Sequence, residues 1–537
     1  MTLNSKQRLV RISAIAATIL AALSTSIAAA VPNVLVVCPT PFRDALAPWE
    51  ELRRKQGHEF EVIDVPKDAS ELKAVIRKIA AGGRLETIVL VGDVPIDSTL
   101  PELKRLTIPT NYVPAKVNRR WGSEPTIASD AVFADTNGDG TPDVAVGRIP
   151  ADTPAQLAAV VRKIIRYETR TEHEPWDRRL AAVAGAGDFG VMADALIEAA
   201  GQQIMKQALP PGYLVALTRA KTGSAVLGPM NSIPLSVPSP NKRAPIGQQI
   251  DEGSLLWVYL GHAHPTALDY VAGPTGPESI LSVEDVPQLR GAARCPLAFF
   301  VSCYTGACDA TSDSLAEALL LAEEGPVSVV AATRVSMPYG NTVFSYEFLR
   351  ASLGDRPATL GDAFRLAQQR TFAAGDGDAM RKSIDSMATS LSPMLHKGNE
   401  IWRPEDLATE RREHVAMYQL LGDPLLRWRR PRSIKLTAAA EAMAGAPLII
   451  EGGAEFEGNC IVELARMGGT SASHDGGAKS NILATVSERV RNGAFRISLP
   501  IPADASGPLV VRAYLRGEAG SAVGGANILV RPAAASQ

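Results

Sequence analysis

The chain has 537 residues, of which 46% are hydrophobic and 21% are charged. This length exceeds one ordinary hydrophobic core, so two or three domains are expected, and the composition excludes a largely disordered chain. The formal net charge of −2 gives no electrostatic reason to expect nucleic acid or an anionic membrane as a partner.

Residues 1–30 have the pattern of a secretory signal peptide. Three basic residues precede an apolar stretch, Ala14–Leu23, and three alanines ending at Ala30 form a small-residue cleavage site. A membrane anchor is the alternative, but the stretch is shorter than the ~18 residues that a span needs. We therefore expect a secreted, periplasmic or cell-surface protein with no membrane span in the mature chain.

Short apolar segments alternate with helical patterns through the first 210 residues, which predicts a parallel, right-handed α/β layer. The region 101–125 is expected to be irregular. We expect a larger α/β domain over residues 31–432, built from subdomains of roughly 31–150 and 151–432. The predicted strands are Asn33–Cys38, Phe60–Val65, Glu86–Gly92, Val144–Ile149 and Leu180–Gly187, and the predicted helices are Trp49–Gly57, Ala69–Gly82, Thr153–Glu168 and Asp194–Ala208.

An acidic loop precedes the fourth of these strands. Oxygen-bearing side chains alternate at Asp135, Asn137 and Asp139, a glycine follows at the turn, and Asp143 closes the loop. This spacing suits a hard cation such as Ca²⁺. The full EF-hand pattern fails because a valine occupies its last position, and a plain acidic turn is the alternative.

Two later apolar runs, Leu255–His264 and Leu297–Cys308, stop abruptly at small residues and then present a reactive side chain. Such runs are typical of strands that are buried on both faces of a parallel sheet. Ligand sites of open parallel sheets lie beyond the carboxyl ends of the strands, where His262 and Cys303 are expected. A thiol and an imidazole at neighbouring strand ends are the minimum parts of a cysteine nucleophile and its base.

Further groups could complete such a site. Asp188 follows the preceding buried strand at the same edge of the sheet and could orient the imidazole. Backbone N–H groups in the turn after Ser302 could stabilise an oxyanion, and the amides of Gly261 and His262 are further candidates.

Other interpretations of the same residues remain open. Cys303 could be an inert buried residue, or it could form a local disulfide with Cys308, which would abolish its nucleophilicity. The two cysteines with His262 and His264 could instead bind zinc, although the spacing is poor for that. The chain has five cysteines, so at least one thiol is unpaired within the monomer.

The rest of the chain divides at residue 433. Before it we expect a surface excursion at Pro210–Pro245, a polar, mobile segment at Ala373–Glu400 and a turn at Gly422-Asp423-Pro424. Residues 433–537 have the alternating pattern of an all-β sandwich. The predicted elements are the helix Ser314–Glu324, the strand Val327–Thr333, and the sandwich strands Ile434–Ala438, Leu448–Glu451, Cys460–Ala465, Phe495–Leu499, Leu509–Tyr514 and Asn527–Val530.

The two central motifs, Gly261-His262-Ala263 and Val301-Ser302-Cys303, resemble those of caspase-like cysteine peptidases, and within that group the gingipain family. The resemblance covers nearly the whole mature chain, and it includes the β-sandwich. Further stretches match in the same order, namely Ser129-Asp130 through Val144-Ala145-Val146-Gly147-Arg148, Tyr167-Glu168, Ala316-Glu317-Ala318-Leu319 and Gly422-Asp423-Pro424.

This resemblance implies a caspase-like, mostly parallel sheet with flanking helices, followed by an immunoglobulin-like sandwich. It gives Cys303 the role of nucleophile, His262 that of base and Asp188 that of the acidic partner. His264 is a rival base that lies two residues further from the strand. The family's preference for basic residues depends on an acidic pocket residue, for which Asp194 is only a weak match, so no preference is carried over.

The sequence thus predicts a secreted cysteine endopeptidase that acts on proteins or peptides through an acyl-enzyme and needs no cofactor for its chemistry, with Ca²⁺ as a structural ion. The alternative is a catalytically inactive secreted scaffold of the same fold that acts as a binding or adhesion protein. A disulfide between Cys303 and Cys308 would favour the scaffold.

Overall fold

The computed structural model describes residues 32–96, 105–185, 209–219, 245–272, 277–291, 294–395, 403–466, 482–491 and 493–532. The predicted signal peptide, Asp188, Asp194, the helix expected at Asp194–Ala208 and most of the excursion expected at Pro210–Pro245 lie outside these residues. No helix in the described ranges is both long and apolar enough to cross a bilayer.

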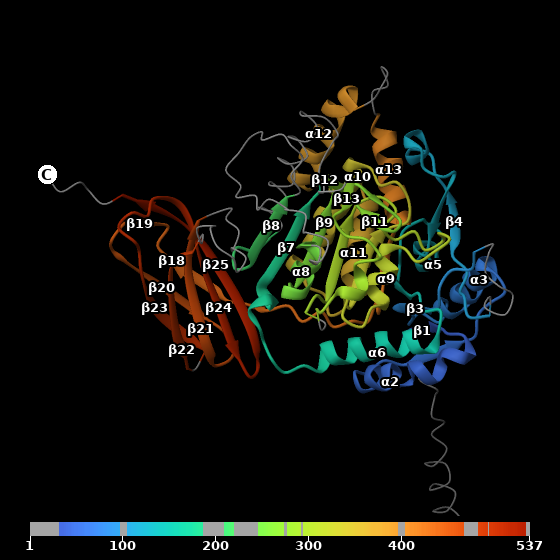
Figure 1. The fold of residues 1–537 in the computed structure, drawn as a ribbon, viewed down its shortest axis with the longest axis horizontal. Coiled ribbons are helices and arrows are strands. Elements are labelled where there is room, and N and C mark those ends of the chain that lie inside the picture. The colour runs from blue at the N-terminus through green and yellow to red at the C-terminus, as the bar shows by residue number, and fades with distance from the viewer. Residues whose placement is uncertain are drawn as a thin grey trace, which may run out of the picture.

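A ten-stranded sheet forms the centre of the larger part of the molecule (Figure 1). Its pairings are parallel except that of β15 with β16, so the first five strands in the order below run opposite to the other five. The carboxyl ends of β15, β14, β9, β7 and β8 therefore meet at one edge. The strands, in spatial order, are β2 (Phe60–Ile63), β1 (Val34–Val37), β3 (Thr87–Val91), β6 (Ala145–Ile149), β16 (Tyr418–Leu421), β15 (Ser328–Ala332), β14 (Leu297–Val301), β9 (Leu256–Leu260), β7 (Arg179–Ala184) and β8 (Leu214–Arg219).

Helices cover both faces of the sheet (Figure 1). Alternate residues of each buried strand enter different cores; in β14, Phe299 joins the core that contains α2, α6, α10, α11 and α13, whereas Phe300 joins that of α8 and α9. Helix α3 covers the strands of the first half on their second face. The helices are α2 (Arg43–Lys55), α3 (Ala69–Ala80), α5 (Ala131–Ala134), α6 (Pro154–Thr169), α8 (Pro245–Glu252), α9 (Leu315–Leu321), α10 (Pro338–Leu349), α11 (Leu360–Phe372), α12 (Ala379–Leu395) and α13 (Pro404–Met417).

By chain origin the sheet has two halves: β2, β1, β3 and β6 come from residues 34–149, and the other six strands come from residues 179–421. These halves meet where β6 lies beside β16, and a single registered pair, Leu421 with Arg148, joins the two strands. The turn that follows β16 reinforces this junction. A Cβ atom on Gly147 would lie 2.7 Å from Cδ of Pro424, so glycine is required for this close approach. Nearby, the amide of Gly422 donates to the carbonyl of Arg148 at 2.7 Å.

A buried carboxylate in this turn binds the first helix of the domain. Asp423 accepts hydrogen bonds from Trp49 Nε1 at 2.6 Å and from the guanidinium of Arg53, both on α2. Arg53 also forms an ion pair with Glu168 on α6 at 2.8 Å. Asp423 and Arg53 are both fully buried, so the charges depend on each other for stabilisation.

Two further sheets share one hydrophobic core at the carboxyl end of the chain. The larger sheet contains β17 (Arg432–Ser433), β25 (Gly520–Arg531), β24 (Gly507–Gly517), β21 (Gly458–Arg466), β22 (Ile482–Val490) and β19 (Glu441–Met443), and the smaller contains β18 (Lys435–Ala438), β20 (Pro447–Gly453) and β23 (Ala494–Pro500). This β-sandwich lies beside the edge of the central sheet that ends in β8 (Figure 1).

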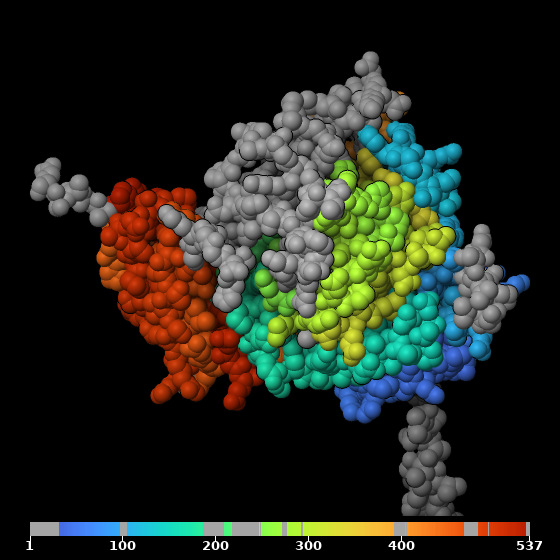
Figure 2. Space-filling view, viewed as in Figure 1, coloured from blue at the N-terminus to red at the C-terminus, as the bar shows by residue number. Residues whose placement is uncertain are grey.

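The sandwich packs against the segment that leads into β7 (Figure 2). Arg178 and Glu463 form a bidentate ion pair, with N···O distances of 2.6 and 3.2 Å, and both side chains are buried. The Arg178 guanidinium also lies 4.8 Å from the ring centre of Tyr514, whose hydroxyl donates to the Glu174 carbonyl at 2.7 Å.

The predicted fold class, a mostly parallel sheet with helices followed by an all-β region, is confirmed. Helix α12, Ala379–Leu395, lies within the segment Ala373–Glu400, for which the sequence predicted mobility and no helix. The region 101–125 also contains a strand, β4 (Asn111–Pro114), which pairs with β5 (Thr126–Ser129). The remaining short strands form hairpins, β10 (Ala263–His264) with β11 (Ala267–Leu268) and β12 (Tyr270–Ala272) with β13 (Pro277–Ser279).

Replacing Asp423 by alanine is expected to lower the free energy of unfolding by about 3–5 kcal/mol, because it removes one of the two carboxylates that pair with the buried Arg53 guanidinium and leaves Trp49 Nε1 without its acceptor. Urea denaturation monitored by circular dichroism measures the loss. Glu51→Ala on the same helix removes an exposed ion pair with Lys55 and is the matched control. Its free energy of unfolding is expected to equal that of the parent. Equal stability of the two variants would contradict the role given to Asp423.

Candidate active site

Cys303 and His262 follow neighbouring parallel strands of the central sheet. In the register of β14 and β9, Val301 lies opposite Leu260, and each reactive residue comes two positions after its strand end. The amide of Gly261 donates to the carbonyl of Val301 at 3.4 Å, so the two chains are still adjacent beyond the strands. The topology therefore brings the predicted thiol and imidazole to one edge of one sheet.

The turn after Cys303 is unusual in its backbone. Tyr304 has a φ of +58°, a left-handed conformation that L-residues other than asparagine and aspartate seldom adopt. Its amide donates to the Arg334 carbonyl at 3.1 Å, and its hydroxyl donates to Glu124 at 3.0 Å. Strained residues of this kind cluster at functional sites, where surrounding contacts hold them in place.

The sulfur of Cys303 contacts the loop that follows β15, the strand on the other side of β14. The amide of Ser336 donates to Sγ at 3.4 Å, and the Ser336 carbonyl lies 3.7 Å from Sγ, where it can accept from the thiol. Burial raises the pKa of the Cys303 thiol, while hydrogen bonds from the main chain and side chain of Ser336 lower it. The side chain remains partly exposed, unlike those of the other four cysteines.

His262 is fixed through its backbone. Its amide donates to Asp269 Oδ2 at 3.2 Å, and its carbonyl accepts from the Asp269 amide at 3.1 Å and from the Tyr259 hydroxyl at 2.9 Å. The Tyr259 hydroxyl also lies 3.0 Å from Asp269 Oδ2. A Cβ atom on Gly185 or on Gly261 would lie within 2.8 Å of this carboxylate, so both glycines make room for it.

Two of the candidate oxyanion donors are already engaged. The Gly261 amide bonds to the Val301 carbonyl, and the His262 amide bonds to Asp269. In the turn after Ser302, the amides of Tyr304, Gly306, Ala307 and Cys308 also bond to carbonyls. The amides of Cys303 and Thr305 stay as candidates for a developing oxyanion.

The other predicted residues are separated from this pair. His264 is exposed on the β10–β11 hairpin, with its ring 6.3 Å from that of Tyr270. Cys308 is buried and accepts from Gln419 Nε2 at 3.5 Å. Both Cys303 and Cys308 are free thiols, which does not support a disulfide between them.

The acidic loop bonds mainly to itself. Asp143 Oδ2 accepts from the amide and hydroxyl of Thr136 at 2.9 and 2.8 Å, and from the amide of Asn137 at 3.2 Å. Asp135 accepts from two glycine amides, and Asp139 from the amide two residues later. As they stand, these oxygens are turned to backbone amides rather than to a common centre, as in a plain acidic turn.

Neither this loop nor the proposed zinc set forms a recognisable metal centre. Among the residues that the structure describes, no group of three or more His, Cys, Asp or Glu side chains is arranged to hold a metal ion.

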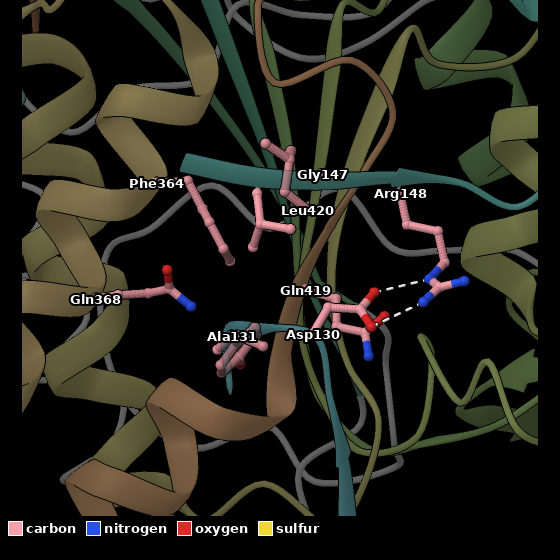
Figure 3. Close-up of a pocket in the computed structure, with 10 residues that line it drawn as sticks. Asp130, Ala131, Gly147, Arg148, Phe364, Gln368, Gln419 and Leu420 are labelled. Atoms are coloured by element: carbon pink, nitrogen blue, oxygen red, sulfur yellow. Dashed lines mark hydrogen bonds and ion pairs between the residues drawn. The ribbon is translucent and has the colours of Figure 1, made fainter. Parts of the chain in front are cut away.

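A small internal cavity of about 10 Å³ lies at the junction of the two halves of the sheet (Figure 3). Beside it, Arg148 forms a bidentate ion pair with Asp130, at 2.7 and 2.8 Å, and donates to the carbonyls of Gly92 and Ile108. The volume is close to what a single water needs, so this is not a substrate pocket. Asp130 and Arg148 belong to motifs of the family resemblance, and their role is to hold the fold.

Sequence reasoning missed Asp269, Tyr259 and Ser336. Ser336 follows the strand Val327–Thr333, so the rule that ligand sites lie beyond carboxyl ends could have marked its loop. Asp269 lies seven residues after His262, in a region where no apolar pattern predicts secondary structure.

Comparisons with known proteins identify the family and the fold. The model of "Peptidase family C25" matches residues 27–429. The solved structure of the Arg-specific cysteine proteinase gingipain R has 17% sequence identity and a TM-score of 0.51, with 93% of this chain and 98% of that chain covered. The complex of the Porphyromonas gingivalis RgpB pro- and mature domains has 17% sequence identity and a TM-score of 0.50, with 93% of this chain and 100% of that chain covered. A structure described as a protease has 16% sequence identity and a TM-score of 0.52, with 93% of this chain and 97% of that chain covered.

Among curated proteins the sequence has no match. At these identities the structural likeness shows the fold, whereas the family model spans most of the chain. The family model and the fold confirm the resemblance inferred from the motifs. The chain belongs to peptidase family C25, the gingipain family of cysteine-type peptidases.

Proposed function

We propose that this peptidase is a secreted endopeptidase in which Cys303 is the nucleophile and His262 is the general base. The placement of the two residues at register-matched ends of β14 and β9 carries the proposal. The partly exposed, free thiol and the strained turn that follows it support the same assignment. The signal pattern of residues 1–30 supports export, which the N-terminal sequence of the mature protein tests.

In the proposed reaction the His262 imidazole takes the thiol proton, and the sulfur attacks the carbonyl carbon of the scissile peptide bond. The amides of Cys303 and Thr305 are the proposed donors to the oxyanion. Protonated His262 then gives its proton to the leaving amine, which leaves a thioester on Cys303. Water, deprotonated by His262, hydrolyses the thioester and restores the thiol. Asp188 stays the proposed acidic partner of the imidazole.

Replacing Cys303 by alanine is expected to lower the turnover of a fluorogenic protein substrate by at least about a thousandfold, because no other group can form the acyl-enzyme. Iodoacetamide should label Cys303 first, since the other four thiols are buried. Cys308→Ala removes a buried thiol five residues away and is the control that should retain turnover. Undiminished cleavage by Cys303→Ala would refute the assignment.

Asp269→Ala is expected to lower kcat by up to about a hundredfold with little change in KM, because the main chain that carries His262 loses its anchor and the base shifts. Steady-state kinetics separate the two parameters. Asp285→Ala removes a carboxylate that caps the amide of Ser282 later in the same region, and it serves as the control. A rise in KM alone would show that Asp269 acts on substrate binding instead.

Calcium binding by the acidic loop stays a prediction. If the loop binds Ca²⁺, millimolar calcium should raise the melting temperature relative to EGTA, and Asp139→Ala should abolish that difference. Asp143→Ala should destabilise the protein in either buffer, because it removes the acceptor of several loop hydrogen bonds. Identical melting in calcium and in EGTA would leave the loop as an acidic turn.

A further inference from the structure

The loop after β15 approaches the Cys303 sulfur from the side opposite to β9. Strand β14 lies between β9 and β15, so the proposed base follows one neighbour and Ser336 follows the other. The Ser336 amide donates to Sγ at 3.4 Å, and the Ser336 carbonyl lies 3.7 Å from the same sulfur. The Ser336 side chain acts in the same direction as its amide, because hydrogen bonding by either lowers the pKa of the thiol. The proposed nucleophile thus has a polar contact, with Ser336, that is separate from its pairing with His262.

Two buried side chains from distant parts of the chain fix this loop. Asn118 Nδ2 donates to the Val335 carbonyl at 2.8 Å, and His414 Nε2 accepts from the Met337 amide at 3.1 Å. Both side chains are fully buried. The residues on either side of Ser336 are therefore tethered, so the position of its amide and hydroxyl is defined by packing rather than by the loop alone.

Asn341 defines the direction of the Ser336 hydroxyl. Its Nδ2 donates to the Ser336 carbonyl at 3.3 Å and to Ser336 Oγ at 3.0 Å. A carbonyl can only accept, so the nitrogen of the amide must face Ser336, and Oδ1 is left to accept from the Tyr418 hydroxyl at 2.7 Å. Because Ser336 Oγ accepts from Asn341, its own proton is left for another acceptor, and the main chain of the same residue already contacts the sulfur.

We propose that Ser336 stabilises the thiolate of Cys303 by donating hydrogen bonds to Sγ, and that Asn341 and Tyr418 are positioning residues that aim the Ser336 hydroxyl. A thiolate is a stronger acceptor than a neutral phenol, so loss of the thiol proton draws the Ser336 proton to the sulfur. In the neutral thiol, the S–H bond instead donates to the Ser336 carbonyl. This inference rests on the proposed role of Cys303.

Several titratable groups surround the sulfur. Burial lowers the pKa of His414 to about 4, raises that of Tyr304 to about 12 and raises that of Tyr418 as well. None of the three changes charge between pH 5 and 9. Asp269 raises the pKa of the thiol through its charge, and histidine is the side chain that ordinarily titrates in this range. The variants below are therefore also compared on a His262→Gln background.

The test is the pH dependence of the iodoacetamide reaction at Cys303, located by tandem mass spectrometry. Ser336→Ala is expected to slow the reaction at pH 7 by about tenfold and to move its midpoint to higher pH, while Ser336→Thr, which keeps the hydroxyl, stays within about twofold of the parent. Asn341→Ala should shift the midpoint in the same direction by less. Ser345→Ala, which removes a buried hydroxyl on α10 with no hydrogen-bond partner among the described residues, should change nothing.

An unshifted profile for Ser336→Ala would overturn the inference, and so would an equal shift for Ser345→Ala, which would mark a general packing effect. If Ser336→Ala fails to fold, the Asn341→Ala profile decides in the same way. Alkylation reads the sulfur directly whether or not peptides are cleaved. Loss of the Ser336 effect is therefore distinguishable from a failure of the proposed function, which the turnover of Cys303→Ala reports.

Discussion

The buried pair of Asp423 and Arg53 is the constraint on which the architecture depends. The central sheet consists of four strands from the first 150 residues and six strands from later in the chain, and the two groups share only one registered residue pair where they meet. Backbone ladders therefore contribute little to this junction. A fully desolvated carboxylate in the turn after β16 bonds instead to an arginine and a tryptophan of α2, and that arginine reaches α6. Since either charge alone would be costly inside the protein, the pair specifies how the halves align.

That alignment places the proposed chemistry beside a strand with neighbours on both sides. The nucleophile follows β14, the base follows β9, and Ser336 follows β15. Each of the three is held by neighbouring groups. A residue in the left-handed conformation follows the cysteine, a buried aspartate and a buried tyrosine bind the histidine backbone, and a buried asparagine bonds to the serine. Burial disfavours the thiolate form of the cysteine. Groups that are already in place before substrate binds offset that cost and let the thiol be activated when substrate arrives.

Features that depend on local sequence patterns could be predicted from the sequence, whereas features that depend on contacts between distant residues could not. Strands such as Leu297–Val301 are buried on both faces, so an uninterrupted apolar run announces them, and the carboxyl-end rule then places His262 and Cys303. Helix α12 escaped prediction because scattered polar residues hide its period, and α10 is buried nearly all round. Asp269 and Ser336 escaped because their roles arise from contacts across the fold, which no local pattern encodes.

The buried ion pair between Arg178 and Glu463 has a consequence for the length of chain that can stand alone. Arg178 comes directly before β7, and its guanidinium is enclosed by the sandwich. Cutting the chain at residue 432 would leave that cation without a counter-charge and expose the apolar surface around it. The β-sandwich is thus an integral part of the peptidase rather than a separable domain. Proteolytic cleavage between the α/β domain and the sandwich would yield two fragments that stay associated in solution.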